Sequence, residues 1–477
     1  MPALPRSFAR TASTVARRPR LHAGAAALLL LSIGLGTNAA GATAGPQPHL
    51  ARGAASGRAL LPPGLINHIL VIDLENEGYP TTFGAQSPAV YLNTTLRAEG
   101  ELIPGYYATG HFSLDNYIAQ VSGQAPTMLT KADCANFATR TFSYLDVSPG
   151  TDDPNPGVNP GQVDGNGCVY PAPNPATGAH GAPTIADQLD ALFPPDPATH
   201  RAAWREYAED MGDNSTRDGG TSDPTGGTDC AHPAVGGADQ AEVATATDQY
   251  ATRHNPFMYF HSVIDNAAEC RANVVPLGTL RADGTPDPSG HLAQDLADPA
   301  RAPRFGFITP NLCDDGHDAT CAGVNAEGGH TGGLAAADLW LKHWMPMILG
   351  SPAYQQGDTL VVLTFDEADA DPSTAGYAAA CCNEQPGPNV VAPGDSTFQA
   401  TSDTAPGGGR TGAVLFDKRY ITPGSVDTTG TYNHYSALRS YEDLLGLWFG
   451  GADGRGHLGF AAQSGLQPFG SDVFNAF

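Results

Sequence analysis

The sequence predicts an α/β fold with a doubly wound, mostly parallel central sheet, helices on both faces and disulfide-bonded loop insertions. Two segments, 67–73 and 359–367, are almost continuously apolar, which is typical of strands buried on both faces of a parallel sheet. Such segments alternate with amphipathic helix patterns, and this alternation indicates βαβ units. Stretches rich in Gly, Pro, Asp and Ser interrupt the pattern without separating two self-sufficient halves, so we expect one large domain.

The expected strands are short apolar runs bounded by turn residues. The first and the strongest of them end directly in carboxylates, and ligands of open α/β sheets bind at the carboxyl ends of the strands. In chain order, we expect strands at 67–73, 102–108, 203–208, 256–261, 305–312, 359–367 and 413–416.

The expected helices lie between these strands. The segment 334–349 has apolar side chains on one side at helical spacing. The segment 433–446 has Asn433 at the N-cap position. In chain order, we expect helices at 89–98, 113–122, 184–192, 334–349 and 433–446. The expected surface insertions are 148–175, 217–237, 283–302 and 369–409.

The first 44 residues have the composition of an export signal peptide. Five arginines precede the apolar run 23–36, no acidic residue occurs before Ala44, and small residues of the kind that signal peptidases cut follow. An uncleaved anchor is the alternative, although the apolar run is short for a membrane span. The pair Arg17-Arg18 leaves both the general secretory route and the twin-arginine route open.

Beyond residues 1–44 we expect a flexible segment at 45–65 and a single domain at 66–477. The formal charge of the chain is −25, and loss of the five arginines would make it −30. Such an acidic surface argues against nucleic acids and anionic membranes as partners. An anionic substrate would need a local cation, and a bound metal is the obvious supplier. We expect a secreted or periplasmic protein without stable membrane insertion.

Eight cysteines fit an oxidising compartment. No C-x-x-C pair of zinc spacing is present, so disulfides are the default. The economical pairings join Cys134 with Cys168, and Cys313 with Cys321. The adjacent Cys381 and Cys382 are expected to reach two different partners rather than each other.

The segment 110–123 predicts a short helix that begins at Ser113 and ends before Gly123. A hydroxyl at a helix N-terminus lies among free backbone N–H groups at the positive end of the helix dipole. This place suits a group that attacks, and then carries, a phosphoryl anion. The alternative is that Ser113 is simply an N-cap.

Ligand-type side chains follow three of the predicted strands. They are Glu75 and Asn76, then Asp314, Asp315 and His317, and finally Asp366 and Glu367. His111 and Ser113 join them from the turn after the second strand, and His434 joins them from a helix start. Because the strand ends of a parallel sheet lie along one edge, these groups can converge.

Carboxylates and an amide oxygen suit a divalent cation such as calcium, magnesium or manganese, and histidine also permits zinc. A metal that touches Ser113 would lower the pKa of its hydroxyl and neutralise a phosphoryl group.

Each of these groups also has a structural alternative. The pair after the first strand could cap the next helix, and the pair after the strongest strand could be a solvated strand end. His317 could decorate a small disulfide loop, and His434 lies beside the N-cap residue Asn433. Because the joint pattern is much less expected by chance than any single match, we favour a metal-assisted phosphoryl-transfer site.

Five motifs together resemble the bacterial and fungal phosphoesterase family that includes acid phosphatases and phosphatidylcholine-preferring phospholipases C. This family is similar in fold to alkaline phosphatases. The motifs occur in family order at 67–76, 111–117, 310–318, 363–367 and 432–444. The resemblance therefore implies an alkaline-phosphatase-like fold for a region from about residue 66 to residue 449.

The resemblance implies a role for each matching residue. Ser113 would be the nucleophile, and Asn116 would bind a phosphoryl oxygen. The expected metal ligands are Glu75, Asn76, Asp366 and Glu367, with Asp315 added from the strand-end pattern. The residues expected to contact phosphate, protonate the leaving group or hold a second metal are His111, His317 and His434.

Two departures from the family motif matter, because Phe112 and Asp115 replace prolines and Asp115 adds a negative charge. The chain ends soon after the last family helix, which favours the smaller phosphatase branch. We expect a small phosphate monoester as substrate, hydrolysed through a Ser113 phosphoenzyme at acidic to neutral pH. A phosphodiester, such as a phospholipid headgroup, a phosphoinositide or a nucleotide, is the alternative substrate. An exported cation-binding scaffold without catalysis, using Asp-rich loops such as 209–214, is the alternative of another class.

Overall fold

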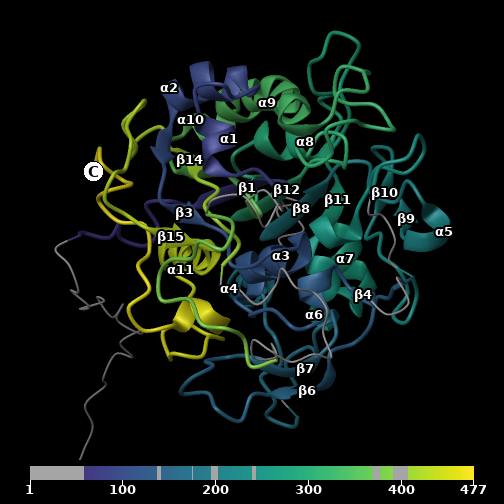
Figure 1. The fold of residues 1–477 in the computed structure, drawn as a ribbon, viewed down its shortest axis with the longest axis vertical. Helices are drawn as coiled ribbons and strands as arrows, with labels where there is room; N and C mark the ends of the chain where they lie inside the picture. Colours follow the sequence, from purple (N-terminus) through teal and green to yellow (C-terminus); the bar gives the residue numbers. More distant parts are fainter. Residues whose placement is uncertain are drawn as a thin grey trace, which may run out of the picture. The chain divides into compact units, whose positions relative to one another are not determined.

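A seven-stranded sheet forms the centre of the computed structural model (Figure 1). The structure describes residues 58–136, 141–174, 176–194, 202–238, 243–368, 376–389 and 407–477. In spatial order the strands are β11 (Val274–Pro276), β8 (Trp204–Ala208), β12 (Phe305–Thr309), β1 (His68–Leu74), β13 (Thr359–Phe365), β14 (Ala413–Phe416) and β2 (Glu101–Ile103). The pairs from β11 to β13 are parallel, and β14 runs against both of its neighbours. The predicted mostly parallel α/β sheet is confirmed.

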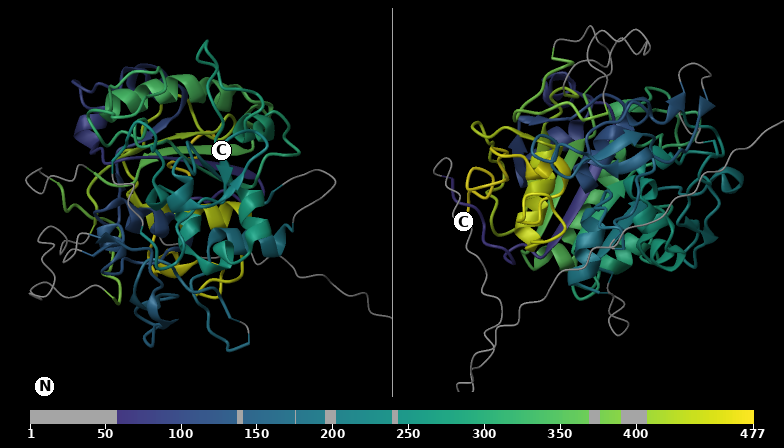
Figure 2. Two further views of the ribbon diagram at one scale, coloured as in Figure 1. Left: turned by 90° about the vertical axis from the view of Figure 1, so that its right-hand side faces the viewer. Right: turned by 90° about the horizontal axis from the view of Figure 1, so that it is seen from below.

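Helices cover both faces of this sheet (Figure 1 and Figure 2). One face carries α3 (Ser113–Ser122), α4 (Ile185–Leu192) and α11 (His434–Leu445), and the other carries α8 (His291–Leu296), α9 (Gly333–Gly350) and α10 (Pro352–Gln355). Along β1, Ile69 and Val71 belong to the first core, and Leu70 and Ile72 belong to the second. This alternation explains the continuous apolar pattern, because successive side chains of a strand point to opposite faces.

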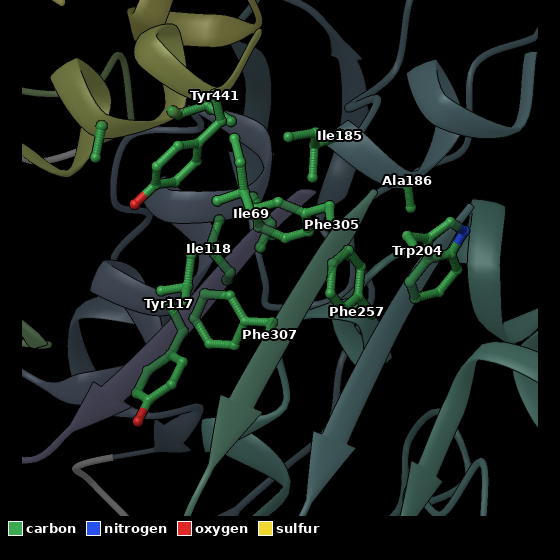
Figure 3. Packing of buried hydrophobic residues seen from close by; sticks show 14 of the residues in the cluster. Ile69, Tyr117, Ile118, Ile185, Ala186, Trp204, Phe257, Phe305, Phe307 and Tyr441 are labelled. Atoms are coloured by element: carbon green, nitrogen blue, oxygen red, sulfur yellow. The ribbon is translucent and has the colours of Figure 1, made fainter. Parts of the chain in front are cut away.

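The first core contains many aromatic rings (Figure 3). Tyr117 of α3 and Phe307 of β12 lie with ring centroids 6.0 Å apart, and Trp204 of β8 and Phe257 lie 4.5 Å apart. Aromatic pairs at these separations add to the stabilisation that comes from burial of apolar area. This packing fixes α3 against the strands whose ends form the candidate site.

The remaining elements are short. They are α1 (Tyr79–Phe83), η1 (Leu92–Leu96), α2 (Arg97–Glu99), β3 (Tyr106–Tyr107), η2 (Thr130–Ala132), β4 (Ala135–Asn136), β5 (Thr141–Phe142), β6 (Ser148–Asp152), β7 (Val163–Asn166), α5 (Ser215–Asp218), β9 (Thr221–Ser222), β10 (Thr228–Asp229), η3 (Thr252–His254), η4 (Pro256–Tyr259), α6 (His261–Ile264), α7 (Ala267–Asn273), β15 (Tyr432–Asn433) and η5 (Gly459–Ala462).

Two predicted strands are wrong or divided. The segment 256–261 forms the 3₁₀ turn η4 and the start of α6 instead of a strand of the central sheet. Pro256 cannot donate to a strand ladder, and Phe260 makes an isolated bridge with Tyr170 rather than a continuous ladder. The segment 102–108 is split between β2 and β3, which belong to different sheets. The other predicted strands and helices are present, with ends that differ by a few residues.

Four disulfides join all eight cysteines. The predicted pairs Cys134–Cys168 and Cys313–Cys321 are confirmed, and the fourth pair is Cys230–Cys270. The prediction for the adjacent cysteines is wrong, because Cys381 and Cys382 are bonded to each other. The left-handed backbone at Cys382, with φ of 66°, accompanies this bond between neighbours.

The predicted signal peptide at 1–44 and most of the segment 45–65 lie outside the described residues, so both stay predictions. The described residues, from 58 to 477 with the gaps given above, belong to one compact unit. Within the described part of the chain, no helix is both long and apolar enough to cross a membrane.

Candidate active site

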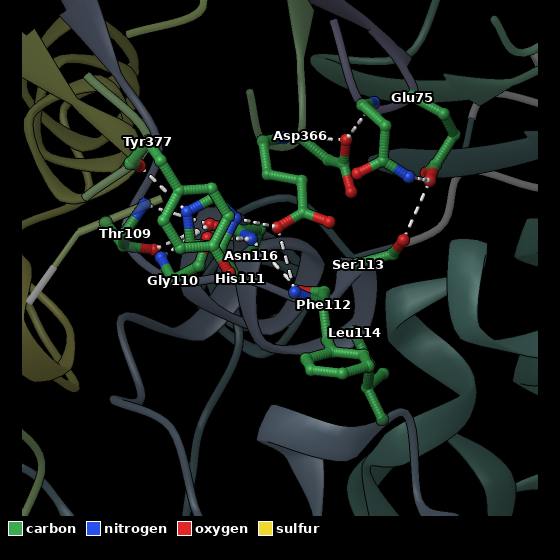
Figure 4. Close-up of polar contacts among 12 residues, drawn as sticks. Glu75, Thr109, Gly110, His111, Phe112, Ser113, Leu114, Asn116, Asp366 and Tyr377 are labelled. Atoms are coloured by element: carbon green, nitrogen blue, oxygen red, sulfur yellow. Dashed lines mark hydrogen bonds and ion pairs between the residues drawn. The ribbon is translucent and has the colours of Figure 1, made fainter. Parts of the chain in front are cut away.

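Strands β1 and β13 end side by side and bring together the pair Glu75 and Asn76 and the pair Asp366 and Glu367 (Figure 4). Leu74 pairs with Phe365 in the sheet, so the residues that follow each strand meet at the same edge. The backbone N–H of Asn76 donates to Asp366 Oδ1 at 2.9 Å, and the N–H of Glu367 donates to the same oxygen at 2.6 Å. We call Glu75, Asn76, Asp366 and Glu367 the β1/β13 cluster.

Ser113 lies directly on this cluster. Its hydroxyl donates to Glu75 Oε2 at 2.7 Å, and both side chains are buried. Helix α3 begins at Ser113, and its N-cap residue is Phe112, which adopts a left-handed backbone with φ of 81°. A bulky residue in this conformation is strained, and such strain often accompanies a sharp turn at a functional site. The N-cap alternative for Ser113 is wrong, because its hydroxyl bonds a distant carboxylate and not the helix.

Tyr117 fixes the other oxygen of the same carboxylate. Its hydroxyl lies one turn after Ser113 and donates to Glu75 Oε1 at 2.6 Å. The ring of Tyr117 stacks on the ring of His254, with centroids 5.3 Å apart. Helix α3 therefore supplies both the hydroxyl that touches Glu75 Oε2 and the hydroxyl that orients Glu75 Oε1.

His111 binds Glu367 rather than facing Ser113. Its Nδ1 lies 2.8 Å from Glu367 Oε2, and its Nε2 lies 2.8 Å from the backbone oxygen of Tyr377. Both ring nitrogens therefore lie beside oxygen atoms of the protein. The N–H of Phe112 also donates to Glu367 Oε2 at 2.8 Å. His111 therefore orients a member of the cluster in this structure.

Asn116 fixes the turn that presents Ser113. Its Oδ1 accepts the N–H groups of Thr109 and Gly110 at 2.9 and 3.1 Å. Its Nδ2 donates to the backbone oxygens of Gly110 and Phe112. Asn116 therefore braces the loop, and its expected contact with a phosphoryl oxygen stays a prediction.

Of the two acids that follow β12, Asp315 lies beside the β1/β13 cluster and Asp314 does not. The backbone oxygen of Asp315 accepts the N–H of Glu75 at 2.8 Å, which joins this loop to the cluster. His317 follows with an exposed side chain. Asp314 instead accepts the N–H of Ala326 at 2.9 Å, and it shares a separate acidic group with Glu209 and Asp210.

His434 supports the cluster from the start of α11. Its Nε2 lies 2.6 Å from the backbone oxygen of Asp366, and its Nδ1 lies 3.2 Å from the hydroxyl of Tyr106. Complete burial lowers the pKa of His434 to about 4. The neutral ring therefore positions Asp366 here, and a direct contact of His434 with phosphate stays a prediction.

Arg253 and His254 were not predicted from the sequence. Arg253 Nε lies 3.8 Å from Asp133 Oδ2, and Asp133 Oδ1 accepts the N–H of Leu114 at 2.9 Å. His254 Nε2 lies 3.3 Å from Glu75 Oε1, and its Nδ1 lies 3.8 Å from Asp315 Oδ2. The chain has only 24 lysines and arginines, so the adjacent Arg253 and His254 were the sequence feature that could have indicated a cationic part of the site.

Burial and mutual repulsion raise the pKa values of the carboxyl groups of this site. Burial raises the pKa of Glu75 to about 7, although Arg253 and the hydrogen bonds from Tyr117 and Ser113 oppose this rise. Burial, followed by the charge of Glu75, also raises the pKa of Asp366 and of Asp315 well above the usual range. Removal from water and nearby like charges both disfavour a carboxylate anion, and a cation would relieve both effects.

The oxygen atoms of the site fit a hard divalent cation. Asn76 Oδ1, Asp315 Oδ2 and Asp366 Oδ2 are buried and have no hydrogen-bond partner. Buried polar atoms are normally satisfied, so three such acceptors at one sheet edge point to a missing donor or cation. Among the described residues, no three His, Cys, Asp or Glu side chains are already arranged as a complete metal-binding group.

Comparisons with known proteins find partial sequence similarity to fungal acid phosphatases. No family model matches the chain. The chain is 25% identical over 272 residues to an acid phosphatase of Aspergillus fumigatus, which covers 57% of this chain and 39% of the relative. It is 24% identical over 274 residues to a phosphate-repressible acid phosphatase of Penicillium chrysogenum, which covers 57% of this chain and 42% of the relative. The match therefore spans less than half the length of each of these two relatives.

Solved structures give weaker likenesses. An alkaline phosphatase superfamily protein from Vibrio parahaemolyticus has a TM-score of 0.40 and 12% identity, covering 82% of this chain and 68% of that chain. A phosphonate monoester hydrolase from Silicibacter pomeroyi has a TM-score of 0.36 and 13% identity, covering 80% of this chain and 73% of that chain. From the sequence matches, the resemblance to acid phosphatases that the motifs indicated is confirmed.

Proposed function

We propose that the chain is a phosphoesterase that hydrolyses phosphate monoesters, with Ser113 as the nucleophile and a divalent cation at the β1/β13 cluster. The observation that carries this proposal is the 2.7 Å hydrogen bond between Ser113 Oγ and Glu75 Oε2. The Ser113 hydroxyl is buried at the first position of a helix and bonds the carboxylate that follows β1. A phosphoryl-transfer nucleophile would account for this arrangement. The sequence similarity to fungal acid phosphatases supports the same reaction class.

In the proposed reaction the Ser113 hydroxyl passes its proton to Glu75 Oε2, to which it already donates, and Oγ attacks phosphorus. The bond from phosphorus to the alcohol oxygen breaks, and a phosphoserine forms. Water then hydrolyses the phosphoserine and releases inorganic phosphate. The departing alkoxide needs a proton, and His317 is the candidate donor because its side chain is exposed at this sheet edge. His111 and His434 are buried, and both ring nitrogens of each already face protein acceptors or donors.

Arg253 supplies the local positive charge that an anionic substrate needs in this acidic chain. Asp133 links Arg253 to the first turn of α3 through its contacts with both Arg253 and the N–H of Leu114. The positive end of the α3 helix dipole adds partial positive charge on the same side. We therefore propose that Arg253 and the α3 N-terminus bind the phosphoryl oxygens.

The proposed cation ligands are Glu75, Asn76, Asp366 and Glu367, with Asp315 beside them. The unpartnered oxygens of Asn76, Asp315 and Asp366 support this assignment. Because most of the donors are carboxylate and amide oxygens, calcium, magnesium or manganese is favoured over zinc. Bound there, the cation would neutralise phosphoryl oxygens and lower the pKa of the Ser113 hydroxyl.

The test is the hydrolysis of p-nitrophenyl phosphate by Ser113→Ala. We expect kcat to fall on the order of a thousandfold or more, as for removal of other covalent nucleophiles. The matched control is Ser122→Ala at the other end of α3, where the hydroxyl donates to the backbone oxygen of Pro183 at 2.9 Å. Ser122→Ala should keep activity within about threefold of wild type, since it touches no part of the cluster. Equal activity in wild type and Ser113→Ala would remove Ser113 from the reaction.

The same assay separates the alternatives. A monoesterase should hydrolyse p-nitrophenyl phosphate faster than bis-p-nitrophenyl phosphate, and a diesterase should show the reverse order. Cation binding without hydrolysis of either compound, unchanged in Ser113→Ala, would instead support a non-catalytic scaffold. We also infer that the protein is exported, and the four disulfides support an oxidising compartment.

A further inference from the structure

The disulfide between Cys381 and Cys382 differs from the other three in its access to solvent. The six cysteines of the other bridges are all buried, with at most 8% of any residue exposed. Cys381 and Cys382 are both partly exposed. Thiol–disulfide exchange requires that a thiolate reach one sulfur of the bridge, so a reductant should attack this bridge first.

The same disulfide contributes little to holding the chain together. A disulfide stabilises mainly by restricting the unfolded chain, and this effect grows with the length of the loop that it closes. The other bridges join residues 34, 40 and 8 positions apart, whereas Cys381 and Cys382 are neighbours. Its reduction should therefore change local structure without unfolding the protein.

The segment that contains this disulfide contacts the candidate site at one end. We call residues 376–389 the strap. The backbone oxygen of Tyr377 lies 2.8 Å from His111 Nε2, and the ring of Tyr377 stacks on the ring of His111 with centroids 3.6 Å apart (Figure 4). His111 in turn bonds Glu367 of the β1/β13 cluster at 2.8 Å.

The sulfur atoms sit in the middle of the strap, against the start of α11. Cys382 Sγ lies 3.4 Å from the backbone oxygen of Thr431, and the hydroxyl of Ser436 donates to it at 3.9 Å. Thr431 and Ser436 flank His434, which bonds the backbone of Asp366. At its far end, the side chain of Asn389 bonds the backbone of β7, at Val163 and Gly165. The strap thus contacts His111 through Tyr377, and the bridge itself lies against the residues that flank His434.

We propose that Cys381–Cys382 is a thiol-exchange site through which an external dithiol adjusts the β1/β13 cluster. One thiolate of the dithiol attacks a sulfur of the bridge, the Sγ–Sγ bond breaks, and the leaving thiolate of the protein takes up a proton. The second thiolate of the reagent then displaces the mixed disulfide. The protein gains two electrons and two protons as two cysteine thiols, and the dithiol is oxidised to its cyclic disulfide.

Reduction frees the left-handed backbone of Cys382 and loosens the strap around it. Tyr377 then holds His111 less firmly, and His111 holds Glu367 less firmly. This second step rests on the proposed function, because a change in Glu367 alters hydrolysis only if the cluster is catalytic. Residues of the strap act here by positioning and not by touching substrate.

The test begins with measurements that do not depend on any activity. The oxidised protein is treated briefly with dithiothreitol under native conditions, its free thiols are alkylated with iodoacetamide, and its peptides are analysed by mass spectrometry. We expect labels on Cys381 and Cys382 while the other three bridges remain intact. Hydrogen exchange should become faster in the strap and around His111, and should stay unchanged in β1 and β13. Labelling of another bridge first, or unchanged exchange in the strap, would overturn the proposal.

The second measurement is the turnover of p-nitrophenyl phosphate by the oxidised, reduced and reoxidised protein. We expect kcat/KM to fall about tenfold on reduction, the effect of losing one charge-assisted hydrogen bond, and to recover on reoxidation. The double variant C381S/C382S should resemble the reduced protein and should no longer respond to dithiothreitol. An equal kcat/KM in the oxidised and reduced proteins would contradict the link to the cluster. If no form hydrolyses the compound, the proposed function fails, and the labelling and exchange results alone decide on the thiol-exchange site.

Discussion

Two groups of acids that are buried or half-buried lie at the same edge of the central sheet, and they differ in how their oxygens are satisfied. The β1/β13 cluster lies beside Ser113 and includes buried oxygens without hydrogen-bond partners, on Asn76 and Asp366. The second group, the β8/β12 cluster, consists of Glu209, Asp210 and Asp314.

In the β8/β12 cluster the protein itself supplies donors. The indole N–H of Trp340 and the backbone N–H of Asn311 donate to Glu209 Oε2 at 2.9 and 3.1 Å, and the side chain of Asn311 donates to Asp210 Oδ2 at 2.7 Å. Among these three described acids, no carboxylate oxygen is both buried and without a partner.

Raised pKa values do not distinguish the two clusters. Burial raises the pKa of Asp314 to about 7, and burial raises the pKa of Glu75 to about 7 as well. The difference lies in unmet acceptor capacity and in the presence of a hydroxyl nucleophile. A group of acids at a strand end therefore becomes a candidate cation site only when some of its buried oxygens lack hydrogen-bond partners.

The largest difference expected between the two clusters comes from equivalent substitutions in each of them. Asp366→Asn should reduce kcat/KM for p-nitrophenyl phosphate on the order of a hundredfold or more, because it removes a proposed cation ligand and its charge. The kcat/KM of Asp314→Asn should stay within about threefold of wild type, because Asp314 bonds Ala326 and belongs to the β8/β12 cluster. Steady-state kinetics with matched circular dichroism spectra would check both. Equal losses in the two variants would break the distinction between the clusters.

The next effect concerns cation binding. Removal of divalent cations with a chelator should abolish hydrolysis by the wild type and lower its thermal unfolding midpoint. Restoring the cation at about a hundredfold excess over its Kd should return about 3 kcal/mol of stability. Calorimetry of Asp366→Asn should show no such recovery, while Asp314→Asn should recover like the wild type. A chelated wild type with full activity would exclude a required cation.

A smaller effect is expected from the arginine beside the first cluster. Arg253→Gln should raise KM for p-nitrophenyl phosphate about tenfold, because a charged partner of the phosphoryl group is lost. Arg217→Gln is the control, since its guanidinium pairs with Asp218 and Asp248. Steady-state kinetic curves for both variants would check this prediction. An unchanged KM in Arg253→Gln would contradict the proposal that Arg253 binds the phosphoryl oxygens.

The smallest effect is on stability alone. It involves His457, which pairs with Asp443 and Asp453. Burial would lower the pKa of His457, but hydrogen bonds to Asp443 and Asp453 and the charges of Glu442 and Asp443 raise it to about 9. Because this pKa is above the ordinary value of 6.5, the stabilisation is complete below pH 6.5 and is lost as the pH rises through 9.

Urea unfolding between these two pH values should show a loss of about 2 kcal/mol in the wild type, and His457→Gln should flatten the dependence. Activity at pH 6 should be unaffected by His457→Gln, because none of these groups belongs to the β1/β13 cluster. An identical pH dependence in the variant would assign the loss to other groups.

Much of the fold followed from local patterns in the sequence. Strands β1 and β13 were predictable because burial on both faces demands an unbroken apolar run, and α11 was predictable because Asn433 caps it. The segment 256–261 has the same apolar composition as a strand, yet it packs as a 3₁₀ turn. Composition alone does not reveal whether a buried segment finds a neighbouring strand to pair with.

The site was predictable in part for a similar reason. Parallel strand ends share one edge, so Glu75 and Asp366 could be placed together from topology. Arg253 was not predictable, because it lies in a 3₁₀ turn far from any strand end and reaches the site through Asp133. The backbone oxygens that His111 and His434 contact could not be predicted either, because the sequence pattern of side chains does not indicate which backbone groups lie nearby.

The central claim is that the hydroxyl of Ser113 becomes covalently phosphorylated at the β1/β13 cluster. The most direct measurement is rapid acid quenching during turnover of p-nitrophenyl phosphate, followed by mass spectrometry of the peptide that contains Ser113. We predict a phosphorylated Ser113 in the wild type and none in Ser113→Ala. Phosphate found on a histidine, or on no residue while turnover continues, would contradict the account.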